Sequence, residues 1–464
     1  MIQAWLQRLA RFLDRPFFPW KKLVVGFSLG QFALENWLLY RQYKVYQQTA
    51  KPKALTDEIT QETFDKSQDY SRAKARFSVI SSLFNEAKSM YMLYIDIFPL
   101  GWALAGAAVA QWLPAPFTGE ITRSLIFVFG LSILDTVLGL PFDYYRHFVL
   151  EEAYGFNKMT RGLWIVDALK GLALTVAIGT PIGAAFLSIV HRTGSAFFYY
   201  LWLFMVAFQL LAVTLYPIVI VPMFNKLTPL APGPLRDDVE ALCRRLKFPL
   251  DELSVIDGSK RSAHSNAYFS GLPWKKRIVL FDTLIEQSSG KEVEAVLAHE
   301  LGHWKMGHTT RILLVHQAHL FYLLAAWSSF IGNRSLYAAF GFEKERPIMI
   351  GFMLFNMIYA PVEVVVQLMM NLFTRRMEYQ ADSFANDLGY KTDLAKSLIK
   401  LQIKNLSAMD ADWLYSSFHH SHPILTERLK AIGWVSDGKP ATADLKEENA
   451  VKEEEVVAAS GREL

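Results

Sequence analysis

Residues Ser289–Gly307 read SGKEVEAVLAHELGHWKMG, and this stretch predicts one short amphipathic helix. It opens on Ser289–Glu292, which has the form of a capping box: a serine and a glutamate three residues later satisfy the first free N–H groups of a helix. Gly307 is a suitable stop, because glycine accepts the left-handed backbone that often ends a helix. Between these ends, apolar residues recur at helical spacing, at Val293, Val296, Leu297 and Leu301.

Inside this helix lies the motif HELGH, in which His299 and His303 are four residues apart. Residues at this spacing share one helical face, so both imidazoles can reach one ion. Zinc prefers nitrogen ligands in a tetrahedron, and a catalytic zinc keeps three protein ligands and a water. Glu300 lies about 100° around the helix from His299, too far to bind the same ion, but it can take a proton from that water. The alternative is that the two histidines only cap or pack.

A third ligand is expected from the run RRMEYQAD, in which Glu378 and Asp382 are again four residues apart. We expect Glu378 to bind the metal and Asp382 to accept the N–H of a ligand histidine, which would fix the tautomer of that histidine. The alternative is that Glu378 only pairs with Arg375 or Arg376.

Away from these motifs, the composition is that of a membrane protein. Of the 464 residues, 52% are apolar, 14% are aromatic and only 20% are charged. A helix needs about 20 residues to cross a hydrocarbon core, so the HELGH helix, with its polar flanks, is expected at the membrane surface. Seven other stretches are long and apolar enough to span: Leu23–Tyr40, Tyr91–Leu113, Ser124–Phe142, Trp164–Val190, Ala196–Phe224, Ile312–Gly332 and Pro347–Phe373.

This pattern divides the chain into six parts. Residues 1–22 form an N-terminal segment, and residues 23–224 hold the first five spans. A polar module follows in two pieces, 225–310 with HELGH and 374–434 with Glu378, separated by spans six and seven at 311–373. Two crossings return the chain to the same side, so all three ligands can meet. Residues 435–464 are rich in glutamate and predict a disordered acidic tail.

Other classes of protein are excluded by simple counts. The one cysteine, Cys243, rules out an intramolecular disulfide and a cysteine-based zinc or iron–sulfur site. A net charge of +4 without a basic, aromatic-rich tract does not favour nucleic-acid binding. Ionisable groups inside the spans indicate either helix–helix pairing or a water-filled space. They are Glu35, Asp96, Asp135, Asp167, Lys170, His316, His319 and Glu363.

The chain resembles the CAAX prenyl protease type I family, integral-membrane zinc metalloendopeptidases of the endoplasmic reticulum and inner nuclear membrane. The resemblance runs to about Trp434. It implies a predominantly α-helical membrane protein whose seven transmembrane helices enclose an intramembrane chamber, capped by a zincin-like (HExxH) metalloprotease module with a small β-sheet. It rests on HELGHWKMGH at His299–His308, EYQAD at Glu378–Asp382, Ser265–Tyr268, Gly155–Asn157, Ser421–Pro423 and Glu427-Arg428.

The resemblance also implies a reaction. One zinc per chain would act with Glu300 as base, and His422 and Arg428 would lie near the scissile carbonyl and the C-terminal side of the substrate. The substrate would be a prenylated CAAX protein that loses its last three residues, with a second upstream cut in some members. The expected partners are this substrate and the lipid bilayer, with no nucleic acid, and the chain is expected to be a monomer.

Short strands are predicted at Ser254–Ile256, Asn266–Phe269 and Arg277–Phe281. An extended peptide can bind by adding to an exposed strand edge. The resemblance implies that the backbone at Asn266, Ala267 and Tyr268 is that edge; the alternative is a plain hairpin that stabilises the module.

Two other functions remain open at this point. A membrane quality-control protease that acts on unprenylated or translocon-clogging chains would use the same site. A transporter or channel with a regulatory metal site would explain the spans and their charges, but not HExxH together with ExxxD. The family implies an active site that faces the cytosol or nucleoplasm, and the excess of Lys and Arg on the module's side of the membrane is small.

Overall fold

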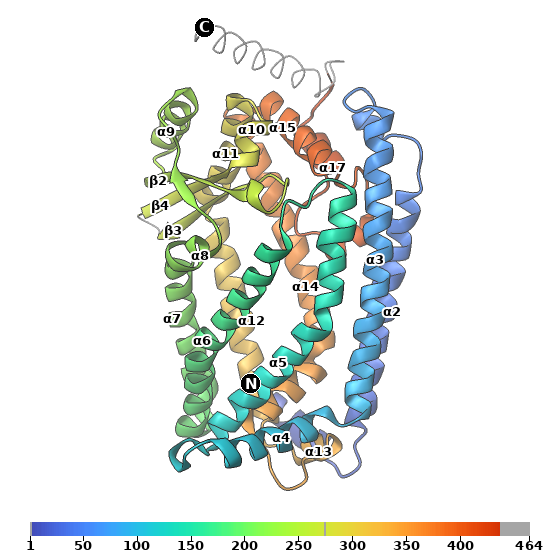
Figure 1. Cartoon of the computed structure of the whole chain (residues 1–464), viewed down its shortest axis with the longest axis vertical. Helices are drawn as coiled ribbons and strands as arrows, with labels where there is room; N and C mark the ends of the chain where they lie inside the picture. Colours follow the sequence, from blue (N-terminus) through green and yellow to red (C-terminus); the bar gives the residue numbers. More distant parts are fainter. Residues whose placement is uncertain (1, 273–274, 437–464) are drawn as a thin grey trace.

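The computed structural model describes residues 2–272 and 275–436 of a mostly helical protein (76%). Long helices run side by side along most of its length, and a small sheet with several short helices gathers at one end (Figure 1). We call this end the cap. The predicted tail lies, from residue 437 onward, outside the described residues.

Six of the seven long helices cover most of a predicted apolar stretch, whereas the helix Gln61–Tyr94 reaches only the first residues of the stretch Tyr91–Leu113. The seven are α2 (Trp20–Tyr46), α3 (Gln61–Tyr94), α5 (Glu120–Tyr145), α6 (Arg161–Thr193), α7 (Phe197–Leu215), α12 (His308–Phe330) and α14 (Ile348–Asp387). Shorter helices accompany them: α1 (Ile2–Leu13), α4 (Ile97–Trp112), α8 (Val221–Phe224) and α13 (Arg334–Ala339). The cap contains α9 (Pro234–Leu246), α10 (Asp282–Gln287), α11 (Gly290–Lys305), α15 (Lys391–Lys404), α16 (Trp413–His419) and α17 (Leu425–Ala431).

Several helical segments are able to cross a membrane. By length and composition, the described residues contain four, and a fifth if α3 and the bent continuation α4 form one span. The four are Glu120–Glu151, Arg161–Phe224, His308–Phe330 and Ile348–Asp387. Segment Arg161–Phe224 includes both α6 and α7, which pack against each other across a short turn at Gly194–Ala196.

The expected continuous helix over Tyr91–Leu113 is wrong. Helix α3 ends at Tyr94, and α4 leaves it at an angle of 69°. Asp96 adopts a left-handed backbone with a φ of 54°, which aspartate tolerates better than most residues. Pro99 then lies in the first turn of α4, where its missing N–H costs no hydrogen bond.

Most of the ionisable groups in the spans have partners. Lys21 pairs with Asp96 at 2.6 Å, and His319 pairs with Glu363 at 2.9 Å. Lys88 and Arg261 pair with Asp135 and Asp167 in the same way, and Lys170 donates to the Met223 carbonyl. Pairing between helices therefore accounts for many of the ionisable side chains in the apolar stretches. Asp96 and Asp135 are nevertheless more than half exposed (53% and 68%), so these pairs are not sealed in a dry interior.

The cap is built on a four-stranded sheet in the order β1-β2-β4-β3. The strands are β1 (Leu227–Pro229), β2 (Leu250–Ile256), β3 (Ala267–Leu272) and β4 (Lys275–Phe281). Strand β3 pairs antiparallel with β4, with Ala267 opposite Leu280, and stands at the edge of the sheet. The three predicted strands are thus confirmed. The sheet, α9, α11, α15 and the end of α14 share one apolar core, which fixes α11 beside the edge strand.

Candidate active site

Helix α11 carries both histidines of HELGH, and its ends confirm the predicted boundaries. Ser289 Oγ accepts a hydrogen bond from the Glu292 backbone N–H at 3.4 Å, and the Glu292 carboxylate accepts from the Ser289 N–H at 2.8 Å. Gly307, just beyond the helix, has a φ of 66°. The apolar face packs into the core of the cap, and this packing holds His299 and His303 in fixed directions.

A glycine in the motif lets α11 lie directly against α14. A Cβ atom added to Gly302 would be 3.0 Å from Cδ1 of Phe384, tighter than ordinary van der Waals contact. The close approach brings the two ligand-bearing helices together. Sequence reasoning assigned Gly302 no role, although a glycine in the middle of a helix already indicates a packing or functional reason.

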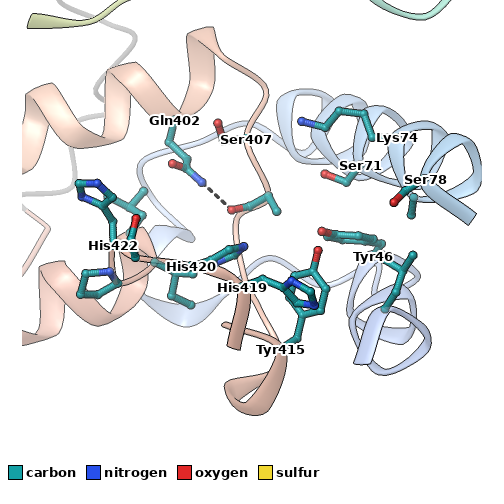
Figure 2. A pocket seen from close by; sticks show the side chains of 17 residues that line it. Tyr46, Ser71, Lys74, Ser78, Gln402, Ser407, Tyr415, His419, His420 and His422 are labelled. Carbon is teal, nitrogen blue, oxygen red and sulfur yellow. Dashed lines mark hydrogen bonds between the residues drawn. The ribbon is translucent and has the colours of Figure 1, made fainter. Parts of the chain in front are cut away.

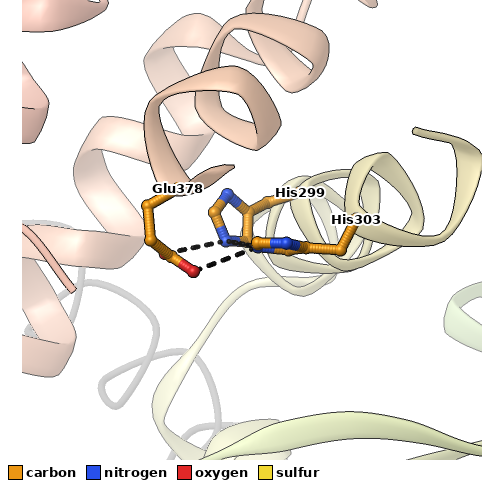
Figure 3. Close-up of side chains that lie close together, drawn as sticks. All are labelled: His299, His303 and Glu378. Atoms are coloured by element: carbon orange, nitrogen blue, oxygen red, sulfur yellow. Dashed lines mark hydrogen bonds and ion pairs between the residues drawn. The ribbon is translucent and has the colours of Figure 1, made fainter. Parts of the chain in front are cut away.

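The three predicted ligands lie together (Figure 3). The Nε2 atoms of His299 and His303 are 3.2 Å apart, and Nε2 of His303 is 3.2 Å from Oε1 of Glu378. Nε2 of His299 is 3.5 Å from Oε2 of Glu378. Ligand atoms about 2.0–2.1 Å from a tetrahedral zinc lie about 3.3–3.4 Å from one another. The three separations are close to this spacing, with a different oxygen of the Glu378 carboxylate facing each imidazole.

The environment of Glu378 also fits a cation. Its side chain is buried, and nitrogen atoms surround its carboxylate: Nε2 of His303 is 3.2 Å from Oε1, and Nδ1 of His422 is 2.9 Å from Oε2. A buried carboxylate is costly unless a cation or hydrogen-bond donors satisfy it, and a metal ion held with the two imidazoles would do so. Its possible pairing with Arg375 or Arg376 does not occur among the described residues, because Arg375 instead bonds Glu427 at 2.6 Å.

Asp382 lies behind His299. Its Oδ1 atom is 2.8 Å from Nδ1 of His299. Arg428 donates one hydrogen bond to each oxygen of Asp382, at 2.8 Å to Oδ2 and 2.6 Å to Oδ1. Burial lowers the pKa of His299, but the carboxylates of Asp382 and Glu378 outweigh it and raise that pKa to about 9. With Asp382 at Nδ1, Nε2 is the atom that faces Glu378, and Asp382 lies where it could orient the imidazole.

His303 has an equivalent support that the sequence did not reveal. Nδ1 of His308 is 3.0 Å from Nδ1 of His303, and Nε2 of His308 is 3.1 Å from Oε1 of Gln380. His308 is fully buried, and it is not one of the three clustered ligand residues. The only signal in the sequence was its position at the end of HELGHWKMGH; its contact with the glutamine of EYQAD required the fold.

A cavity of about 200 Å³, here called the metal cleft, joins these residues to the edge strand. Glu300, His422 and Arg428 line it, as do Asn266 and Ala267 at the start of β3. Tyr268 does not: its side chain packs on the other side of the sheet, against Val221, Ile256 and Val279. The apolar part of the wall comes from Leu284, Val296, Leu394, Leu398 and Leu401.

His422 and Arg428 reach the cleft differently. Nδ1 of His422 is 2.9 Å from Oε2 of Glu378, and its side chain is 67% exposed. The guanidinium of Arg428 is mostly buried and engaged by Asp382, with one nitrogen 4.0 Å from Oε2 of Glu378. Arg375 holds the loop of His422 in place by donating to the His422 carbonyl at 3.3 Å.

Comparison with known proteins shows which protein families the chain matches. Residues 42–226 match the family model described as CAAX prenyl protease N-terminal, five membrane helices, and residues 229–434 match Peptidase family M48. CAAX prenyl protease 1 of Saccharomyces cerevisiae is 48% identical over 448 residues, which cover 93% of this chain and 99% of the relative. The human CAAX prenyl protease 1 homolog is 37% identical, with 89% and 96% covered.

A solved structure has the same fold. The crystal structure of Ste24p from S. mikatae superposes with a TM-score of 0.87 at 46% sequence identity, and the match covers 90% of this chain and 100% of that one. Together with the two family models and the triad of His299, His303 and Glu378, this places the chain in the CAAX prenyl protease 1 family of membrane metalloproteases.

Proposed function

We propose that this chain is a zinc endopeptidase that removes the last three residues from prenylated CAAX proteins, with a second upstream cut in some substrates. One zinc per chain would be held by His299, His303 and Glu378. The observation that carries the proposal is the cluster of two imidazoles and one carboxylate, with nitrogen–nitrogen and nitrogen–oxygen distances of 3.2, 3.2 and 3.5 Å, beside a second carboxylate, Glu300, that lines the same cleft.

When bound, zinc supplies a Lewis acid that acidifies water and polarises a carbonyl. The chain's own residues do the remaining work. Glu300 takes the proton of the attacking water at its carboxylate and later gives it to the leaving amine. His422, whose exposed ring lines the cleft, donates to the oxygen on which negative charge develops. Arg428 acts mainly through Asp382, which keeps Nε2 of His299 aimed at the metal.

The edge strand would hold the substrate. Strand β3 pairs with β4 on one side only within the described sheet, so its other edge is available to an extended peptide. Asn266 and Ala267 line the metal cleft, which would place the scissile bond beside Glu300. The role of Tyr268 would be limited to its backbone, since its side chain faces away.

We further propose that α2, the α3–α4 pair, α5, α6, α7, α12 and α14 are seven spans around an intramembrane chamber, with the cap as a zincin-like module at the membrane surface. The two pieces of the module, 225–310 and 374–434, would meet there. Three further points stay predictions. The protein would reside in the endoplasmic reticulum or inner nuclear membrane, its cap would face the cytosol or nucleoplasm, and it would be a monomer. The meeting of α11 and α14 in one core supports this division.

The direct test is cleavage of a farnesylated CAAX peptide and its unprenylated twin by the purified full chain, with and without chelator, with products identified by mass. We expect a single cut before the last three residues, faster for the prenylated peptide and abolished by chelator. Equal rates on both peptides would favour a quality-control protease. Cleavage by neither, together with ion flux in proteoliposomes that survives Glu300→Ala, would favour a transporter.

A further inference from the structure

A second and larger cavity adjoins the metal cleft. It has a volume of about 560 Å³, within the range of small-molecule sites, and shares His422 with the cleft as a lining residue. Figure 2 shows His422 at one end and Lys74, Ser71 and Ser78 of α3 at the other. We call it the polar cavity. It therefore extends from the metal site to the inner face of a helix that the mechanism does not use.

The wall of the polar cavity is suited to an anion. Among the described residues that line it there is no aspartate and no glutamate. Lys74 is the lysine that lines the cavity. Further hydrogen-bond donors are the hydroxyl groups of Tyr46, Ser71, Ser78 and Ser407. Burial lowers the pKa of His419 and of His420, so these two imidazoles are mostly neutral near pH 7. Lys74 is then the one lysine or arginine among the described residues that line this space.

Lys74 is available to a ligand. Its side chain is exposed, and its Nζ atom lies 4.3 Å from the centre of the Tyr70 ring. In residues 2–272 and 275–436, no carboxylate forms an ion pair with it. The neighbouring carboxylate, Glu151, instead accepts hydrogen bonds from the Tyr70 hydroxyl at 2.8 and 2.9 Å. A lysine with no ion pair among the described residues, in a cavity next to the metal cleft, can bind an anionic ligand.

The two cavities are also connected along the chain. Gln402 lines the polar cavity, and its neighbour Leu401 lines the metal cleft. At the start of the edge strand, Nδ1 of His264 is 3.0 Å from Oδ1 of Asn405, two residues before Ser407 of the polar cavity. Residues that line the two cavities are thus close together in the chain, and the cavities share His422.

We propose that the polar cavity binds the free C-terminal carboxylate of the substrate, with Lys74 as its cationic anchor. This inference rests on the proposed function. Beyond the scissile bond of a CAAX substrate, three residues remain, and in extended form they span about 10 Å. They end in the one negative charge that every such substrate carries. An anchor for this carboxylate in the cavity beside the metal cleft would favour the cut that leaves three residues, whereas an upstream cut would proceed without it.

The test compares two farnesylated CAAX peptides that differ only at their end, a free carboxylate or an amide, with the zinc-loaded full chain. We expect wild type to prefer the acid by about 10- to 100-fold in kcat/KM, the scale of a charge-assisted hydrogen bond. Lys74→Gln should lower the acid rate to that of the amide and leave the amide rate within about twofold. Lys74→Arg should restore the preference.

Lys66→Gln is the matched control, because Lys66 lies on the same helix and pairs only with Glu62 at the surface. It should behave as wild type. Should Lys74→Gln not fold, Lys74→Met keeps the apolar stem against Tyr70 and takes its place, with the amide rate as the check of an intact site. Equal wild-type rates on both peptides, or a preference that survives in the Lys74 variants, would overturn the proposal. Chelator-sensitive cleavage in that case would leave the proposed function standing.

Discussion

Two histidine–carboxylate pairs lie along α14, and they have similar geometry but different surroundings. The His299–Asp382 contact is 2.8 Å, with side chains 7% and 0% exposed. The His319–Glu363 contact is 2.9 Å, with side chains 22% and 45% exposed. Within the described residues, the group that could hold a metal includes His299 but not His319. A histidine–carboxylate contact is thus not enough to make a metal site.

What distinguishes the first pair is the set of groups around it. His303 repeats the imidazole one turn later, and Glu378 adds a carboxylate one turn before Asp382 on α14. Arg428 neutralises Asp382, so the carboxylate can face His299 without the cost of a buried unpaired charge. The second pair has Tyr359 beside His319 and Tyr322 beside Tyr359, and its side chains are more exposed. The comparison predicts that equivalent changes at the two pairs have very different effects.

The largest difference is expected between Glu378→Gln and Glu363→Gln. The first change removes a charged ligand, so we expect metal content to fall from one zinc per chain to a small fraction and cleavage to fall to background. The second should leave both close to wild type, because Glu363 contacts only His319 of the charged groups described. Metal analysis and peptide cleavage on the same preparations decide this. Unchanged zinc content in Glu378→Gln would move the third ligand elsewhere.

Glu300→Gln should separate metal binding from catalysis. Glu300 lines the cleft but is not one of the three clustered ligand residues, so zinc content should stay at one per chain while kcat falls by about 1,000-fold or more. Glu286→Gln, at an exposed position on α10, serves as the control. A Glu300 variant with more than a tenth of wild-type activity would exclude it as the base.

Asp382→Asn should have an intermediate effect. The amide keeps the shape of the side chain but loses the charge that holds Arg428 and fixes the tautomer of His299. Loss of such a support typically lowers metal affinity by about 10- to 100-fold. Competition with a chelator of known affinity measures this, and Asp387→Asn, exposed at the end of the same helix, is the control. Equal affinities for both variants would show that Asp382 does not orient the ligand.

The smallest effect is expected from Gly302→Ala. The added methyl group meets Phe384 at 3.0 Å, so α11 and α14 must separate slightly, and we expect a loss of about 1–3 kcal/mol in stability with zinc still bound. Gly171→Ala, where nothing lies within 4 Å, should be neutral or slightly stabilising. Thermal unfolding in detergent compares the two. Equal unfolding temperatures would mean that the helices do not depend on this close approach.

The sequence alone predicted those features that depend only on residues close to one another in the chain. The capping box at Ser289, the stop at Gly307 and the ligand spacing of HELGH all follow from helical geometry within a few residues. The two long apolar helices between His303 and Glu378 could also be predicted, because a long apolar stretch is enough to indicate each of them. The bend at Asp96 was not, since the apolar stretch continues through it and only Pro99 marks the break.

Features that depend on distant segments needed the structure. The contact between His308 and Gln380 joins residues 72 positions apart, and that between Asp382 and Arg428 joins residues 46 apart. Nothing in the local pattern of either segment specifies its partner. The polar cavity is the extreme case, because Lys74 comes from α3 while His422 comes from the loop between α16 and α17. No run of residues around Lys74 indicated a site.

The most direct test of the metal centre is anomalous diffraction at the zinc edge from crystals of the full, zinc-loaded chain. We predict one peak, bounded by Nε2 of His299, Nε2 of His303 and the carboxylate of Glu378, and no peak beside His319 and Glu363. A zinc peak at any other set of residues, or none within reach of Glu378, would contradict the three-ligand site on which the proposed reaction depends.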